Sequence, residues 1–245
     1  AAIRTRAVKD GNDYILNGSK VFISNGELAD LAVVAAKTNT HKGAGGVSLF
    51  LLEKDTPGFG RGQRIEKIGL HVQDTTELFF EDCRIPKSNL LGEEGQGFKY
   101  LMEKLQQERL VVAMAAQALA ERCLGITLEY VKERNVFGQP LGLFQNTQFV
   151  LAQAATEIQV GRCFVDEITR QHLAGQNVVR EVSMAKLWIG DTLNKIAYRC
   201  QQLFGGYGVC REYEISRIWG DARIQSIYAG TSEIMKLIIS RGLGL

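Results

Sequence analysis

The sequence predicts an α+β fold in which a small antiparallel β-sheet or barrel is followed by an antiparallel four-helix bundle. Two observations support this prediction. Up to about Pro86, apolar and polar residues alternate with period two between turn residues, which is typical of strands. After Leu91-Gly92, long stretches have the 3.6-residue period of amphipathic helices. We therefore expect a β domain over residues 1–90 and a helical domain over residues 91–245, and 245 residues are enough for two cores.

The strand candidates of the first domain are residues 14–16, 20–24, 31–36, 47–52 and 77–80. The first two runs are followed by Asn17-Gly18 and Asn25-Gly26, and Asn-Gly between two strands predicts a tight hairpin. Loops that contain glycine separate the other runs, and no helical pattern lies between them. The pattern therefore favours an antiparallel sheet or barrel over an alternating α/β fold.

The helix candidates of the second domain are residues 98–134, 146–174, 179–204, 213–227 and 232–240. Turn residues mark the breaks at 137–140, at Gly175, at Gly205-Gly206 and at Ala229-Gly230. Pro140 is the only proline between Leu91 and Leu245, which suits long, uninterrupted helices in a bundle.

The composition excludes several classes of protein. Hydrophobic residues make up 45% and charged residues 23%, which is close to the globular average, so a disordered or fibrous chain is disfavoured. The formal net charge is +2, which leaves little attraction for nucleic acid or for an anionic membrane surface. A defined small-molecule site is the better expectation.

No stretch reaches the roughly 18 consecutive apolar residues of a membrane span, and residues 1–9 lack the apolar run of a signal peptide. We expect an intracellular protein without a membrane span. The chain opens at Ala1, without an initiator methionine and within a strand-like pattern, so we also expect sequence upstream of it.

The five cysteines are widely spaced and form no C-x-x-C pair, which argues against a disulfide framework and a zinc cluster. The three histidines lie in unrelated segments and give little support to a metal triad or a Ser-His-Asp hydrolase. We expect reduced thiols and no metal site.

A carboxylate interrupts the apolar stripe of the first long helix. The stripe consists of Phe98, Leu101, Leu105, Glu108, Val112, Ala115 and Leu119. A carboxylate on a buried stripe must be paired, protonated or next to a cavity, because burying it bare costs several kcal/mol. Two interpretations stay open: Glu108 pairs with a buried Arg or Lys or lies at the edge of the stripe, or it is a general base with a raised pKa.

Three further segments each allow either a functional or an ordinary structural interpretation. The step at Ala229-Gly230 precedes a helix start that could bind an anion or oxyanion, or that Thr231 or Ser232 simply caps. Residues 204–208 either allow close backbone approach or only end a helix. Arg134 leads into the turn at 137–141, and the helix dipole alone could explain it.

These features, in this order and after residues 20–26, resemble the acyl-CoA dehydrogenase family over essentially the whole chain, as its middle β domain and its C-terminal four-helix domain. The motifs are R-x-x-F-G-x-P-L at 134–141, Q-x-x-G-G-x-G at 202–208 and Y-x-G-T-x-E at 228–233. The sequence around Glu108, at residues 20–25 and at residues 73–75, is most similar to that of the long-chain branch. The resemblance implies FAD-dependent dehydrogenation of a medium-to-long-chain fatty acyl-CoA to the trans-2-enoyl-CoA in fatty-acid β-oxidation. It also implies an electron-transferring flavoprotein as electron acceptor.

The resemblance also implies roles for single residues. The commonest members carry their catalytic glutamate directly after the tyrosine that matches Tyr228, where this chain has Ala229. The long-chain and isovaleryl branches place the base in an E-R-L context on the first bundle helix, which Glu108 and the two residues after it match. Glu108 is therefore the expected catalytic base. The implied substrate-binding residues are Gln106, Gln107, Arg109, Ala229 and Gly230, with the N–H of Ala229 on the thioester oxygen.

The family resemblance assigns Phe22, Ile23 and Ser24 to the flavin ring. The other implied cofactor-binding residues are Arg134, Phe137, Gln145, Gln202, Leu203, Phe204, Gly205, Gly206, Thr231, Ser232 and Glu233. Some of them would reach the FAD of a neighbouring subunit, so a homo-oligomer is expected, with a dimer of dimers favoured. The expected location is the cytoplasm of a bacterium or the mitochondrial matrix of a eukaryote. The alternatives are a branched-chain, isovaleryl-like dehydrogenase, a flavin-free scaffold and a flavin monooxygenase of the same fold.

Overall fold

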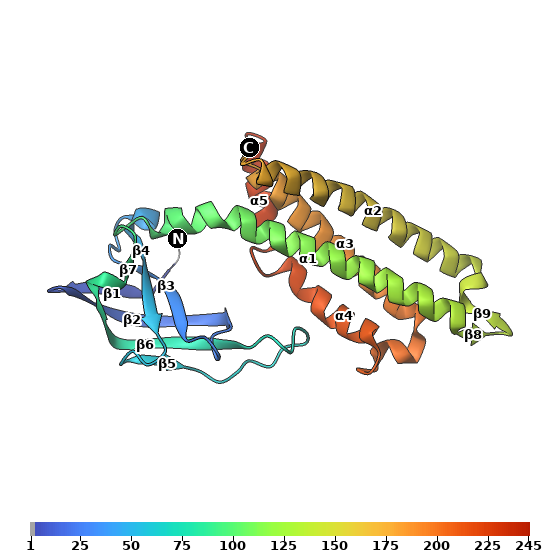
Figure 1. Cartoon of the computed structure of the whole chain (residues 1–245), viewed down its shortest axis with the longest axis horizontal. Coiled ribbons are helices and arrows are strands. Elements are labelled where there is room, and N and C mark those ends of the chain that lie inside the picture. The colour runs from blue at the N-terminus through green and yellow to red at the C-terminus, as the bar shows by residue number, and fades with distance from the viewer. Residues whose placement is uncertain (1–2) are drawn as a thin grey trace. The chain divides into compact units, whose positions relative to one another are not determined.

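The computed structural model describes residues 3–245 (Figure 1). The chain divides into two compact units, the first ending at Lys104 and the second spanning Leu105–Leu245. The boundary lies inside the first long helix, α1 (Gly97–Glu133). The start of this helix belongs to the β unit because Gly97 packs directly on the backbone of Ser48, where a Cβ would lie 2.8 Å from a backbone atom. The predicted α+β fold class is confirmed.

The β unit contains one seven-stranded sheet. Its strands are β1 (Arg6–Asp10), β2 (Asp13–Ser24), β3 (Leu31–Lys37), β4 (Val47–Glu53), β5 (Phe59–Arg61), β6 (Thr75–Pro86) and β7 (Leu90–Leu91). Their order in the sheet is β5-β6-β2-β1-β3-β4-β7. All the neighbours pair antiparallel except β1 and β3, which run parallel, so the sheet is mixed. Alternate side chains such as Tyr14, Leu16, Phe50 and Phe80 form its core.

The predicted hairpin at Asn17-Gly18 is wrong. These two residues lie inside β2, where the register with β6 shifts between Leu16 and Gly18. They form a β-bulge, and the Asn17 side chain both donates to the carboxylate of Asp82 and accepts from its backbone N–H. A Cβ on Gly18 would lie 2.8 Å from the Cα of Thr5, and the φ of Gly18 is +137°. Asn-Gly here bends a strand that pairs with a distant one, and the chain reverses instead between Asp10 and Asp13.

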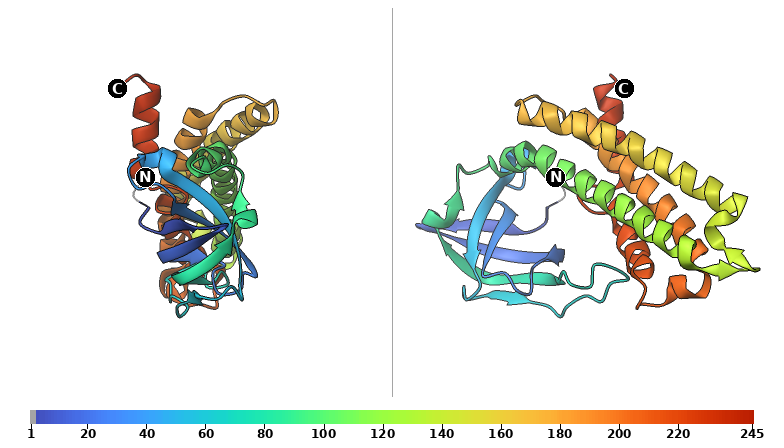
Figure 2. Two further views of the ribbon diagram at one scale, coloured as in Figure 1. Left: turned by 90° about the vertical axis from the view of Figure 1, so that its left-hand side faces the viewer. Right: turned by 45° about the vertical axis from the view of Figure 1, so that its right-hand side comes forward.

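The second unit consists of helices. After the larger part of α1 come α2 (Gln145–Leu173), α3 (Val179–Leu203), α4 (Glu214–Ala222) and α5 (Ser232–Gly242). A small hairpin of β8 (Asn135–Val136) and β9 (Gln139–Pro140) joins α1 to α2. Figures 1 and 2 show that α1, α2 and α3 run alongside one another, and α3 also packs against α4 and α5. The four longer predicted helices coincide with α1, α2, α3 and, together with the short 3-10 helix Arg223–Ser226, α4.

Polar contacts fix α1 against α2. The buried amide of Gln117 donates to the carbonyl of Ile158 at 3.0 Å. Gly161 allows this close approach, because a Cβ there would lie 2.4 Å from the amide oxygen of Gln117. Arg162 forms two hydrogen bonds of 2.8 and 2.7 Å to the carboxylate of Glu121. The amide and the two-pronged ion pair therefore set the register of the two helices.

The predicted buried face of α1 is wrong. Its buried apolar residues include Leu110, Ala113, Ala116, Ala120 and Cys123. On the predicted stripe, Glu108 and Ala115 are exposed, and Val112 and Leu119 are only half-buried. The helix carries two neighbouring apolar stripes, and the stripe rich in alanine faces the core because small side chains let α2 and α3 approach closely. Periodicity alone does not distinguish the two stripes.

Within residues 3–245, α1 is the one helix whose length and composition would allow it to cross a membrane. A core helix meets the same test, and Ala113, Ala116 and Ala120 of α1 lie in the core of the helical unit. Core packing therefore accounts for part of its apolar composition.

Candidate functional site

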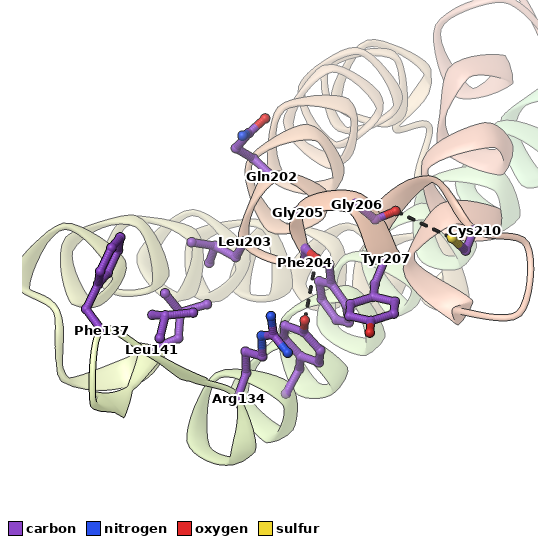
Figure 3. A pocket seen from close by; sticks show the side chains of 12 residues that line it. Arg134, Phe137, Leu141, Gln202, Leu203, Phe204, Gly205, Gly206, Tyr207 and Cys210 are labelled. Carbon is purple, nitrogen blue, oxygen red and sulfur yellow. Dashed lines mark hydrogen bonds between the residues drawn. The ribbon is translucent and has the colours of Figure 1, made fainter.

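A cleft of about 450 Å³ opens at the end of the helical unit where α1 and α3 terminate (Figure 3). Seven residues with an expected cofactor role line it, namely Arg134, Phe137, Gln202, Leu203, Phe204, Gly205 and Gly206. They come from two segments about seventy residues apart, which the helix pair brings together. The structure thus places two of the three sequence motifs in one cleft.

Arg134 supplies the positive charge of the cleft. Its backbone N–H donates to Tyr130 and its carbonyl accepts from Leu141 at 2.7 Å, so the hairpin after α1 fixes its position. The guanidinium lies over the ring of Tyr207, 5.7 Å from the ring centre. Within the part of the chain that the structure describes, Arg134 forms no salt bridge. The charge can therefore pair with an anion such as a diphosphate.

Aromatic rings form one wall of this cleft. Tyr130 stacks on Phe204 with ring centres 4.0 Å apart, and the Tyr130 hydroxyl donates to the Phe204 carbonyl at 3.4 Å. Burial raises the pKa of Tyr130, and the nearby Arg134 opposes this effect. Tyr213 contacts both rings edge-on. The wall holds the end of α3 and the turn at Gly205, whose φ is +59°, in a fixed position.

The tip of the β8–β9 hairpin is a strained turn. Phe137 and Gly138 have φ angles of +49° and +84° and lie between the paired residues Val136 and Gln139. Positive φ at both central residues is typical of a type I′ turn, but Phe is rarely found there. Phe137 is also 97% exposed, so the strain presents an aromatic side chain to solvent beside the cleft.

The side chains of two residues with an expected cofactor role do not lie next to Arg134. Gln145 begins α2, is exposed and does not line the cleft. The side chain of Gln202 points away from Arg134 (Figure 3). Their contact with FAD remains a prediction.

The loop before α5 is held by two cationic side chains. The carbonyl of Ala229 accepts a hydrogen bond from Nε of Arg109 at 3.3 Å, and the carbonyl of Gly230 accepts one from Nζ of Lys186 at 2.5 Å. Ala229 has a φ of +52° and Gly230 a φ of +103°. Burial lowers the pKa of Arg109, and the adjacent Glu108 opposes this effect. The structure thus places the E-R-L segment of α1 beside the loop with the Y-x-G-T-x-E motif.

The start of α5 is capped and anchored. Thr231 is the N-cap, as the sequence allowed, and its hydroxyl accepts from the N–H of Ile234 at 3.4 Å. The hydroxyl of Ser232 donates to Asp191 on α3. Glu233 is exposed, and hydrogen bonds from its own backbone N–H and from Thr231 lower the pKa of its carboxyl. Thr231 and Glu233 stabilise the helix start, and Ser232 fixes it on α3.

The neighbours of Glu108 on α1 have different surroundings. The amide of Gln106 contacts the Nδ1 atom of His172, donates to the carbonyl of Gln176 and accepts from the N–H of Val178. It therefore ties α1 to the connection between α2 and α3. Gln107 and Glu108 are exposed. The structure supports a structural task for Gln106, and the substrate roles of all three residues remain predictions.

In the β unit, a second bulge in β2 changes the direction of the backbone at the residues expected to face the flavin. The register of β2 with β6 shifts between Lys20 and Ile23, and Phe22 has a φ of +58°. The ring of Phe22 is 71% exposed, whereas Ile23 is half-buried and lines a cavity of about 290 Å³. Ser24 is exposed at the end of the strand. Strain at a bulky residue that is presented to solvent is typical of a ligand surface.

Sequence reasoning missed Lys186, which is 2% exposed in the middle of α3. The available signal was a lysine on the buried stripe formed by Val182, Ala185, Ile189 and Leu193. Burial lowers the pKa of Lys186 to about 8.

The residues of this site fit FAD in their chemistry. The diphosphate of FAD would meet the guanidinium of Arg134, and the aromatic rings of FAD would meet exposed or stacked aromatic side chains at Phe137 and in the wall of the cleft. Glu108 lies outside this cleft, 26 residues before Arg134, and its exposed carboxylate is open to a proton donor.

Comparisons with known proteins agree with the motifs. Residues 95–244 match the family described as Acyl-CoA dehydrogenase, C-terminal domain, and residues 1–83 match the one described as Acyl-CoA dehydrogenase, middle domain. The chain is 49% identical over 241 residues to Long-chain specific acyl-CoA dehydrogenase, mitochondrial, of Sus scrofa. This match covers 98% of this chain and 56% of that protein. It is 40% identical over 243 residues to Isobutyryl-CoA dehydrogenase, mitochondrial, of Dictyostelium discoideum, with 99% and 58% covered.

A solved structure of acyl-CoA dehydrogenase from Geobacillus kaustophilus matches the chain with a TM-score of 0.98 at 56% identity. The match covers 100% of this chain and 65% of that one. This chain therefore spans 56% to 65% of the length of these three relatives.

Proposed function

Because this chain belongs to the acyl-CoA dehydrogenase family, whose members are flavin-dependent oxidoreductases, we propose that it forms the middle and C-terminal parts of an enzyme that oxidises a fatty acyl-CoA thioester to the trans-2-enoyl-CoA. One observation supports this function best. Arg109, next to Glu108, donates a hydrogen bond to the carbonyl of Ala229. This bond joins the position of the expected base on α1 to the loop position where the commonest family members carry theirs, so a carboxylate from either position could serve one substrate atom.

Glu108 removes the α-proton of the thioester in this proposal. The proton must leave as negative charge builds up on the thioester oxygen, and the backbone N–H of Ala229 stabilises that charge. FAD, when bound, supplies the acceptor for the hydride from Cβ. Arg134 and the turn at Gly205-Gly206 hold the diphosphate and adenosine portions of a neighbouring subunit's FAD, and Thr231, Ser232 and Glu233 hold FAD at the start of α5.

We further propose a straight-chain substrate of medium to long length, an electron-transferring flavoprotein as acceptor and assembly into a homo-oligomer. The 49% identity to a long-chain enzyme supports the chain length. The 40% identity to an isobutyryl-CoA dehydrogenase keeps a branched-chain substrate as the second candidate. Activity on a series of straight and branched acyl-CoAs with a dye acceptor separates the two, because only one class should give high kcat/KM.

Replacement of Glu108 by Gln in the full-length protein tests the base. The amide keeps the shape but accepts no proton, so kcat should fall by about 10²-fold or more while FAD and acyl-CoA still bind. Glu103→Gln is the matched control, since Glu103 is also an exposed carboxylate on α1, and it should leave kcat unchanged. Activity of Glu108→Gln within a few-fold of wild type would remove Glu108 from the mechanism.

A double variant tests the shared position. Ala229→Glu on the Glu108→Gln background should restore part of the activity, because Ala229 already has a positive φ as a residue with a Cβ and a glutamate adds little further backbone strain. A double variant that binds flavin but stays as inactive as Glu108→Gln would contradict the shared position.

A further inference from the structure

Lys186 is a buried cation among apolar neighbours. It is 2% exposed, and its neighbours on the same face of α3 are Val182, Ala185 and Ile189. An ammonium group loses its hydration at such a position, and this costs several kcal/mol unless a partner compensates. The direct partner of Nζ is the carbonyl of Gly230 at 2.5 Å. An aliphatic side chain would fill the same space at no such cost, so the charge must serve the loop that it holds.

The loop contains two consecutive carbonyls that are each held by a cation from a different helix. Arg109 on α1 binds the carbonyl of Ala229, and Lys186 on α3 binds that of Gly230. Fixing two consecutive carbonyls fixes the planes of the two peptide bonds that follow Ala229, because each bond is planar. These two planes define the φ and ψ of Gly230, which lies between them and has a φ of +103°. The N–H of Ala229, whose φ is +52°, lies in the preceding peptide bond, directly before this fixed step of the loop.

We propose that Lys186 is a positioning residue whose bond to the Gly230 carbonyl holds the loop in place and so keeps the backbone N–H of Ala229 at the thioester oxygen of the substrate. The inference rests on the proposed function and deepens it. Lys186 contacts neither substrate nor cofactor and transfers no proton. It acts through the loop.

The charges around Lys186 come from every helix packed on it. Arg109 of α1 lowers the pKa of Lys186, and Asp191 of α3 and Glu233 of α5 raise it, while burial has the largest effect and lowers it. Asp191 also accepts from Ser232 at the start of α5. The carboxylates partly compensate the buried cation, and the same network connects it to both ends of the loop.

The test is Lys186→Met in the FAD-loaded, full-length enzyme, with Lys195→Met as the control because Lys195 is an exposed lysine of the same helix. We expect kcat to fall about tenfold or more with a much smaller change in KM, and no change in the control. The carbonyl stretching frequency of a bound, non-reacting acyl-CoA thioester should move toward its value in water. Amide exchange of residues 228–231 should become faster.

The outcomes separate this inference from the proposed function. Unchanged kcat, carbonyl frequency and amide exchange in Lys186→Met, with an active wild type, would overturn the inference alone. A wild type that oxidises no acyl-CoA would overturn the proposed function and this inference with it. If Lys186→Met does not fold, Lys186→Gln serves instead, because it keeps a shorter hydrogen-bond donor. It should show the same changes in carbonyl frequency and amide exchange at smaller amplitude. Wild-type values of both in Lys186→Gln would also overturn the inference.

Discussion

Replacing the buried Lys186 by Met should change how the stability of the chain depends on pH. The pKa of Lys186 is lowered from 10.5 to about 8, chiefly by burial. Below pH 8 the side chain is charged in the folded and the unfolded chain, and the folded state bears the full cost, which is about 3 kcal/mol at about 1.36 kcal/mol per pH unit. Between pH 8 and 10.5 the unfolded chain holds the proton that the folded chain has lost, so stability rises with pH.

The free energy of unfolding should therefore rise in wild type relative to Lys186→Met by about 2 kcal/mol between pH about 7 and about 9.5. Reversible urea unfolding of both proteins at a series of pH values, followed by circular dichroism, measures this difference. Titrations of other groups cancel in the comparison unless they are coupled to Lys186. Two parallel curves of stability against pH would refute the reasoning, because Lys186 would then titrate alike in the folded and unfolded states.

Two further predictions follow from the helical unit. Gly161→Ala should lower the free energy of unfolding by about 1 to 3 kcal/mol in urea unfolding, because its Cβ would lie 2.4 Å from the buried amide oxygen of Gln117. Gly125→Ala on α1, where a Cβ meets open space, should instead stabilise by about 0.5 to 1 kcal/mol; equal effects at the two sites would contradict the packing argument. Arg134→Ala should weaken FAD retention and the dimer, since a charge-assisted contact is worth about 1.5 to 3 kcal/mol. Flavin titration with light scattering checks it, and a stable monomer with full FAD would show the assignment to be wrong.

Much of the candidate site could be predicted from the sequence because its residues lie at helix ends with local chemical signals. Arg134 and Gly205 were expected together, and they line one cleft because the helices that carry them are adjacent. Thr231 or Ser232 was expected as the cap, and Thr231 accepts the bond that an N-cap makes within its own turn. Lys186 was missed because its significance depends on a carbonyl forty-four residues away, and no local pattern reports that distance.

The sequence by itself determined where the helices begin and end, since helical hydrogen bonds join residues four apart and the breaking residues act within one turn. It also determined the order of a β unit before a helical unit. The tertiary structure decided which stripe of α1 is buried, because the alanine stripe and the larger apolar stripe both have the helical period, and only the approach of α2 and α3 distinguishes them. It likewise decided that Asn17-Gly18 is a bulge, because β2 continues along β6, a strand about sixty residues away whose pairing outweighs the local preference of Asn-Gly for a turn.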